Sequence, residues 1–217
     1  MAYYFDFDHT LFDTDLFFHV HLRSALLRKL RITEQDWQQT YEYLLSSEYS
    51  IEAHLERLGV LKEDASETIA WLWRTFGDLR PYVFVDVVPT LATLAGRGET
   101  INLITAGNAA WQSYKVRGSG LWSYFGAVMI AEPPASKLAI LRSHGMTAYD
   151  AVVDNDPALL DDIRQAFGTE RTYLINRVPK ETGATGIDDL RYFEARRYLT
   201  RRSVMSHTKI TALTTLL

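Results

Sequence analysis

Cysteine is absent from the 217 residues of this sequence. Its absence excludes thiol nucleophiles, disulfide bonds, thiolate metal sites and iron–sulfur clusters. It is also compatible with a reducing compartment. Any chemistry that this chain performs must therefore come from oxygen and nitrogen groups.

Long hydrophobic runs and an excess of basic charge are lacking too. No stretch approaches the roughly 18 apolar residues that a transmembrane helix needs. The first ten residues, MAYYFDFDHT, have neither the basic region nor the apolar region of a secretory signal. The 23 basic residues are outnumbered by 27 acidic ones, giving a net charge of −4. We therefore expect a cytoplasmic protein that binds neither a membrane nor a nucleic acid.

The first third of the chain reads as one strand followed by helices. Residues 2–7 form an apolar run that predicts a buried strand ending in acidic residues. From Thr14 to Phe76 the apolar residues recur at helical spacing, and Gly59 and Gly77 stand where helices commonly end. We find no convincing strand signal between Thr14 and Phe76.

After Pro81 the pattern alternates between strand and helix, which is typical of a mostly parallel sheet. The strands are expected at residues 100–104, 127–131, 151–153 and 172–175. We predict an α/β fold with a doubly wound, Rossmann-like sheet and an all-helical insertion after its first strand. The predicted domains are a catalytic core (1–15 and 80–200), a helical cap (16–79) and a C-terminal basic tail (201–217).

Two carboxylates stand at the end of the first predicted strand. In extended backbone, Asp6 and Asp8 leave on the same face and Phe7 on the other. Carboxylates so close repel each other, and a divalent cation is a common relief. Thr10 follows two residues later. By itself, the pair is also explained as soluble acidic residues at a strand end.

Three further places offer groups suited to phosphoryl transfer. Thr105 ends a strand, where its hydroxyl and the N–H groups of Ala106 and Gly107 are placed to hold phosphate oxygens. Lys137 opens a helix, and Asp154, Asn155 and Asp156 follow a third strand. Each residue has an ordinary structural explanation by itself, as a cap or a surface side chain. Together they fall where doubly wound sheets bind ligands.

At this point the sequence resembles the haloacid dehalogenase (HAD)-like superfamily of phosphohydrolases, up to about Asn176. FDFDHTLFDT, LITAGN, SKLAIL and VVDNDPALLDD look like its four motifs in order, and QSYKVRGSGLWSYFGAV looks like a segment that many members carry. The helical insertion occupies the place of the cap of the C1 type. The resemblance implies that Asp6 is the nucleophile, that Asp8 is the acid and then the base, and that magnesium is the cofactor.

The site residues predicted from these observations fall into three groups. The catalytic group is Asp6, Asp8, Thr105 and Lys137; the phosphate-binding group is Thr10, Thr105, Ala106, Gly107 and Lys137; the metal ligands are Asp6, Asp8, Asp154 and Asn155. Asn155 falls where the resemblance predicts a metal-binding aspartate. Which of Asp154, Asn155 and Asp156 serves is therefore open.

The function predicted from the sequence is that of a magnesium-dependent phosphatase. It would hydrolyse a small phosphorylated metabolite through an aspartyl-phosphate. Asp8 favours phosphate esters over carbon–halogen bonds, because the family's dehalogenases lack an aspartate at that position. Two alternatives remain. The first is a phosphomutase of the same superfamily. The second is a catalytically weak protein with a binding or regulatory role toward a phosphorylated ligand, and Asn155 is the reason to consider it.

Overall fold

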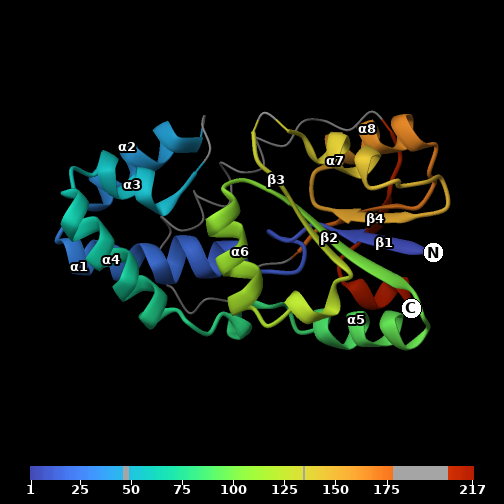
Figure 1. Ribbon diagram of the computed structural model, residues 1–217, viewed down its shortest axis with the longest axis horizontal. Helices are drawn as coiled ribbons and strands as arrows, with labels where there is room; N and C mark the ends of the chain where they lie inside the picture. Colours follow the sequence, from blue (N-terminus) through green and yellow to red (C-terminus); the bar gives the residue numbers. More distant parts are fainter. Residues whose placement is uncertain (46–48, 134, 178–204) are drawn as a thin grey trace.

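The computed structural model describes residues 1–45, 49–133, 135–177 and 205–217. Its six strands form one parallel sheet in the order β3-β2-β1-β4-β5-β6 (Figure 1). The strands are β1 (Ala2–Phe5), β2 (Thr100–Ala106), β3 (Ala127–Ala131), β4 (Ala151–Asp154), β5 (Thr172–Ile175) and β6 (Thr208–Ile210). The predicted α/β class and parallel sheet are confirmed.

Strand β1 lies in the middle of the sheet, between β2 and β4. Tyr4 stands opposite Asn102 on one side and Val152 on the other. Because the strands are parallel, their carboxyl ends lie at one edge of the sheet, and this edge faces the helical group in Figure 1. Residues that follow β1, β2 and β4 are thereby brought together.

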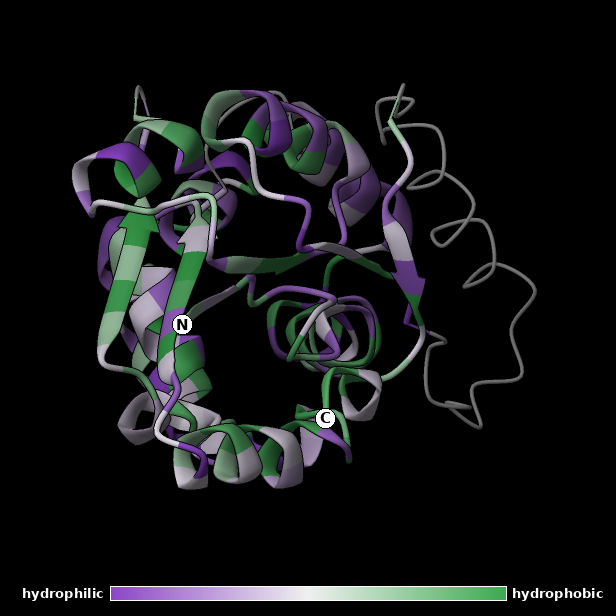
Figure 2. Cartoon of the chain, turned by 90° about the vertical axis from the view of Figure 1, so that its right-hand side faces the viewer, coloured by the Kyte–Doolittle hydropathy of each residue, from purple (hydrophilic) through white to green (hydrophobic). Residues whose placement is uncertain are grey.

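Helices cover both faces of the sheet (Figure 1). α5 (Val87–Gly96) and the short helix η4 (Leu213–Leu216) lie on one face, and α7 (Lys137–Ser143) and α8 (Pro157–Phe167) lie on the other. Alternate residues of β1 contribute to two buried clusters, with Tyr3 and Phe5 in one and Tyr4 in the other. Figure 2 shows green stretches along several of the strands and alternating green and purple around the helices.

Between Thr14 and Phe76 the described regular elements are all helices, as the sequence predicts, and short turns join them. The segment between β1 and β2 contains η1 (Asp15–Leu22), α1 (Arg23–Leu30), α2 (Glu34–Leu45), α3 (Ile51–Arg57), α4 (Lys62–Thr75) and η2 (Arg80–Tyr82). At the start of α2, the N–H of Thr33 donates to Asp36 and the N–H of Asp36 donates to the Thr33 hydroxyl. None of the described helices has both the length and the apolar character that crossing a bilayer requires.

The C-terminal residues differ from the expectation. Residues 201–217 were expected to form a separate basic tail, but β6 pairs with β5 as the sixth strand and η4 packs beside α5. The three residues of β6 are too few to give a strand signal in the sequence. The pairing of β6 with β5 depends on contacts between residues that are distant in the sequence. The basic residues at 191, 196, 197, 201 and 202 lie outside the described residues.

α6 (Ala109–Gly118) and η3 (Trp122–Tyr124) connect β2 to β3.

A buried histidine in the helical group predicts a specific dependence of stability on pH. His54 is fully buried, its Nε2 lies 2.9 Å from the Thr40 hydroxyl, and its Nδ1 lies 3.2 Å from the Tyr49 hydroxyl. Burial lowers the pKa of His54 from 6.5 to about 4. The unfolded chain therefore binds this proton between pH 6.5 and pH 4 while the folded chain does not, so stability falls as the pH falls through that window.

We expect the wild type to lose up to about 3 kcal/mol of unfolding free energy to this group between pH 6.5 and pH 4. His54→Gln retains hydrogen-bonding groups but does not titrate, so its loss over the same range should be smaller by that amount. Urea unfolding of both proteins at a series of pH values measures the difference. Parallel curves would show that His54 does not control this dependence.

Candidate active site

A hollow of about 600 Å³ opens at the carboxyl ends of the strands. Its lining combines acidic, hydroxyl and basic side chains: Asp6, Asp8, His9, Thr105, Ala106, Ala135, Ser136, Lys137, Leu138, Asp154, Asn155, Asp156, Leu159 and Asp162. Seven of the predicted site residues are thus brought together, and Thr10 and Gly107 lie outside the lining. None of the lining residues comes from the described part of 16–79.

Asp6 is held in place from three sides. Its N–H continues the sheet pairing by donating to the Val153 carbonyl at 2.9 Å. The Thr10 hydroxyl donates to Oδ2 of Asp6 at 3.1 Å, and Lys137 Nζ donates to Oδ1 at 2.6 Å. Thr10, which was predicted to bind phosphate, is fully buried and instead supports the carboxylate of Asp6. The i to i+4 spacing of this pair within the loop allows the contact.

Lys137 joins two carboxylates that come from different strands. It is the first residue of α7, whose N-terminus is capped by the Ser136 side chain. Besides Asp6, its ammonium donates to Oδ2 of Asp154 at 2.9 Å. The other oxygen of Asp154 accepts the N–H of Asp156 at 2.8 Å, and the Asp156 side chain caps α8. Both aspartates of this segment therefore have structural contacts.

Burial and the opposing charges shift the pKa values of this cluster in a consistent way. Burial raises the pKa of Asp6 to about 7, with Lys137 lowering it and Asp154 raising it. Burial opposes the charge on Lys137 as well, but the carboxylates of Asp154 and Asp6 outweigh it and raise the pKa of the ammonium above its ordinary value. Lys137 is therefore a permanent cation at the base of the hollow.

Asp8 has a different set of partners, and sequence reasoning missed all three of them. Lys115 Nζ lies 2.5 Å from Oδ1 and 2.7 Å from Oδ2 of Asp8. The Thr14 hydroxyl donates to Oδ1 at 2.5 Å, and Gln112 Nε2 donates to Oδ2 at 3.0 Å. Burial alone would raise the pKa of Asp8, but Lys115 and the other donors hold it well below its usual range.

The turn after β2 is built from Thr105 to Gly107. Thr105 is buried at the end of the strand, and the backbone of Gly107 has a φ of 123° that disfavours other residues. The Gly107 N–H donates to the Ala131 carbonyl at 3.1 Å. It is therefore not available for the phosphate contact that the sequence predicted. The Ala106 carbonyl accepts Gln112 Nε2 at 2.7 Å, which ties this turn to α6.

The donor set of the hollow is compatible with a hard cation. Its charged and amide oxygens suit magnesium, which commonly binds one or two protein carboxylates and keeps several waters. No group of three or more His, Cys, Asp or Glu side chains that could hold a metal occurs among the described residues. A magnesium ion at Asp6 would thus have an incomplete protein shell. Which residue of the segment 154–156 completes it stays a prediction.

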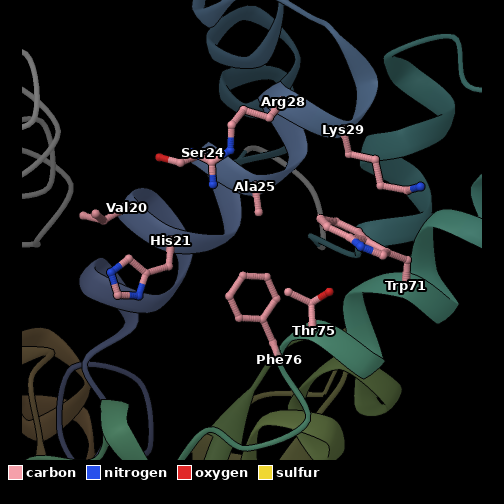
Figure 3. A pocket seen from close by; sticks show the side chains of 9 residues that line it. All are labelled: Val20, His21, Ser24, Ala25, Arg28, Lys29, Trp71, Thr75 and Phe76. Carbon is pink, nitrogen blue, oxygen red and sulfur yellow. The ribbon is translucent and has the colours of Figure 1, made fainter.

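A second hollow, of about 710 Å³, lies within the helical group (Figure 3). It is formed by η1, α1 and α4 and shares no lining residue with the hollow at Asp6. Arg28 and Lys29 stand at its upper side in Figure 3, and Trp71 and Phe76 face them from α4 and its end. The Lys29 ammonium lies 5.1 Å from the centre of the Trp71 ring.

Comparison with known proteins matches no family model and no curated protein. Solved structures do match over 99% of this chain. They include a haloacid dehalogenase-like hydrolase of Burkholderia xenovorans (18% identity, 94% of that chain, TM-score 0.67). A HAD phosphatase of Thermococcus onnurineus has 20% identity over 95% of its chain (TM-score 0.64). The L-2-haloacid dehalogenase of Xanthobacter autotrophicus, with chloropropionic acid covalently bound, has 21% identity over 96% of its chain (TM-score 0.62).

Identities of 18–21% establish the fold and leave the activity open, because the similar structures include both a phosphatase and a dehalogenase. The parallel sheet with helices on both faces is consistent with this likeness. The chain therefore has the fold of the haloacid dehalogenase-like hydrolases.

Proposed function

We propose that this protein is a magnesium-dependent phosphatase that hydrolyses a small phosphorylated metabolite through an aspartyl-phosphate on Asp6. The observation that carries the proposal is the pair of carboxylates, Asp6 and Asp8, lining one hollow with the Lys137 ammonium. Phosphoryl transfer needs a positioned nucleophile, neutralised charge and a proton for the leaving group. The residues of this hollow offer each of these.

In the first step, a carboxylate oxygen of Asp6 attacks the phosphorus atom as the bond between phosphorus and the ester oxygen breaks. Lys137 would neutralise charge on the transferring group, and the Thr105 hydroxyl would bind one of its oxygens. Asp8, once protonated, gives its proton to the leaving alkoxide. The products of this step are the free alcohol and an aspartyl-phosphate.

In the second step, water attacks the phosphorus atom of the aspartyl-phosphate. The ionised Asp8 takes a proton from that water, the bond from phosphorus to Asp6 breaks, and inorganic phosphate leaves. Magnesium, when bound by Asp6, Asp8 and the segment 154–156, supplies charge neutralisation to the phosphate oxygens. The hydrolysis ends with the carboxylate of Asp6 released and the proton from water on Asp8. Because the Lys115 ammonium favours the ionised form of Asp8 in this structure, substrate binding would have to raise the pKa of Asp8 before it could protonate the next leaving oxygen.

Asp8 also distinguishes this proposal from dehalogenation. A carboxylate that displaces a halide makes a leaving group that is a very weak base and needs no proton. An alkoxide needs one, so an acidic group beside the nucleophile serves ester cleavage and has no comparable task in carbon–halogen cleavage. A phosphomutase would use the same first step and pass the phosphoryl group to a sugar.

The helical segment 16–79 is proposed to act as a cap that selects the substrate. It joins the core near residues 12–15 and 79–83. At the first of these junctions, His9 Nδ1 lies 3.3 Å from Asp15 Oδ2. None of its described residues lines the hollow at Asp6 in this structure. Closure over a bound phosphate would exclude water from the leaving group and favour small substrates.

The proposal is tested by incubating the protein and magnesium with a panel of phosphorylated metabolites and an aryl phosphate. Free phosphate is measured after each incubation, and halide release from 2-chloropropionate is measured in parallel. We expect phosphate release that disappears on chelation of the metal. Halide release without phosphate release would show a dehalogenase instead. If neither phosphate nor halide were released, the result would favour a binding protein.

A further inference from the structure

We propose that Gln112 and Lys115 of α6 are positioning residues that fix the carboxylate of Asp8 toward the hollow. The inference rests on the proposed function, since it concerns the group that would protonate the leaving oxygen. Both side chains are buried, with 5% and 3% exposed, whereas Asp8 is partly open to the hollow with 23% of its side chain exposed. Neither lines the hollow, so both would act through Asp8.

The contacts determine the orientation of the carboxylate. Lys115 reaches both oxygens of Asp8, while Thr14 donates to Oδ1 and Gln112 donates to Oδ2. Rotation of the Asp8 carboxylate about its bond to Cβ would break hydrogen bonds to both of its oxygens at once. The side chain is therefore restrained at both oxygens, with the turn of Thr14 on one side and α6 on the other.

The amide of Gln112 has a single favourable orientation. Its two close neighbours, Asp8 Oδ2 and the Ala106 carbonyl, are both acceptors, so the nitrogen must face them. The amide oxygen, Oε1, is buried and has no hydrogen-bond partner among the described residues. A buried acceptor without a partner lowers stability. Stability alone would not select this side chain, whereas a tie between Asp8 and the turn of Ala106 does explain it.

Gly107 makes room for this tie. A Cβ atom at position 107 would lie 3.2 Å from Nε2 of Gln112, closer than ordinary van der Waals contact. The φ of 123° at the same residue disfavours side chains as well. The turn after β2, Gln112 and Asp8 are thus fitted to one another, and the direction of α6 fixes them together.

Removal of one partner of a buried ion pair lowers stability, so Lys115→Met must be compared with the wild type for folding as well as for turnover. The Lys115 ammonium has Asp8 as its partner and lies 5.7 Å from the centre of the Phe7 ring, in the loop that separates Asp6 from Asp8. A general acid must lie within hydrogen-bond reach of the leaving oxygen, and a displacement of about 1 Å can cost roughly a hundredfold in rate. Loss of Lys115 should therefore lower turnover.

The test compares Lys115→Met with Arg117→Met, which removes an exposed cation from the same helix. Turnover is measured for an alkyl phosphate and for an aryl phosphate, whose leaving group needs little protonation. We expect Lys115→Met to lower kcat about 10- to 100-fold for the alkyl ester and only a few-fold for the aryl ester. Arg117→Met should match the wild type. Equal losses on both esters would overturn the inference.

A double-mutant cycle separates positioning from a structural role. Asp8→Asn alone should lower alkyl ester turnover by roughly 10²- to 10⁴-fold. If Lys115 acts through Asp8, adding Lys115→Met to Asp8→Asn should change turnover little. A further loss as large as that of Lys115→Met in the wild-type background would contradict the inference, because it would show that Lys115 acts independently of Asp8.

Crystal structures of Lys115→Met and Arg117→Met give a readout that does not depend on activity. We expect the carboxylate of Asp8 to leave its contacts with Thr14 and Gln112 in Lys115→Met and to keep them in Arg117→Met. An unmoved carboxylate in Lys115→Met would overturn the inference. If the wild type hydrolyses no phosphate ester, the proposed function fails, and these structures still decide whether Lys115 positions Asp8.

Discussion

Asp6→Asn is expected to abolish phosphate release while leaving the fold intact. The amide has nearly the shape of the carboxylate, but it is neutral and its oxygen is a poor nucleophile. It can still accept the Lys137 hydrogen bond through Oδ1, and Lys137 retains its ion pair with Asp154. The sheet contact through the backbone N–H of residue 6 does not depend on the side chain.

Free phosphate and the circular dichroism spectrum of Asp6→Asn measure these two expectations together. Asp64→Asn is a matched control, because it makes the same change on an exposed aspartate of α4. It should keep wild-type turnover. Undiminished phosphate release from folded Asp6→Asn would remove Asp6 from the role of nucleophile.

Lys137→Met is expected to lower both turnover and stability. Removing a cation aimed at the transferring group should reduce kcat by at least 10²- to 10³-fold, the order seen when one charge-stabilising donor is lost. Asp6 and Asp154 would also lose the ammonium they share, and removal of one partner of a buried ion pair typically costs about 3–5 kcal/mol. Initial rates and urea unfolding measure the two effects.

A second substitution distinguishes the two effects of Lys137→Met. Adding Asp154→Asn removes one of the two carboxylates and should restore part of the lost stability without restoring turnover. Lys209→Met, which changes an exposed lysine of β6, should affect neither quantity. If Lys137→Met kept most of the wild-type kcat, charge neutralisation by this ammonium would have no part in the reaction.

The convergence of the site was predictable from the sequence for a physical reason. Asp6, Thr105 and Asp154 each lie within one residue of a strand's carboxyl end, and parallel strands place these ends at one edge. Knowing the strands therefore sufficed to bring these residues together. The helical nature of the segment between β1 and β2 was equally readable, because its apolar residues recur at helical spacing over many turns.

The partners of Asp8 were not predictable in the same way. Gln112 and Lys115 are three residues apart, so they share one face of a helix, and this spacing was visible in the sequence. Which group that face meets depends on how α6 packs beside the turn of Gly107, and no local pattern encodes this. The contact of Thr10 with Asp6 and that of the Gly107 N–H with Ala131 likewise depend on how the loops fold.

The most direct test of the account is to trap the phosphoryl group on the protein. The protein is mixed with magnesium and a substrate that releases phosphate, and the reaction is quenched in acid within the first turnovers. The protein is then digested, and the masses of its peptides are measured by mass spectrometry. We expect the mass of one phosphoryl group on the peptide that contains Asp6, and none on that peptide from Asp6→Asn. A protein that releases phosphate with this peptide unmodified, or modified at another residue, would contradict the account.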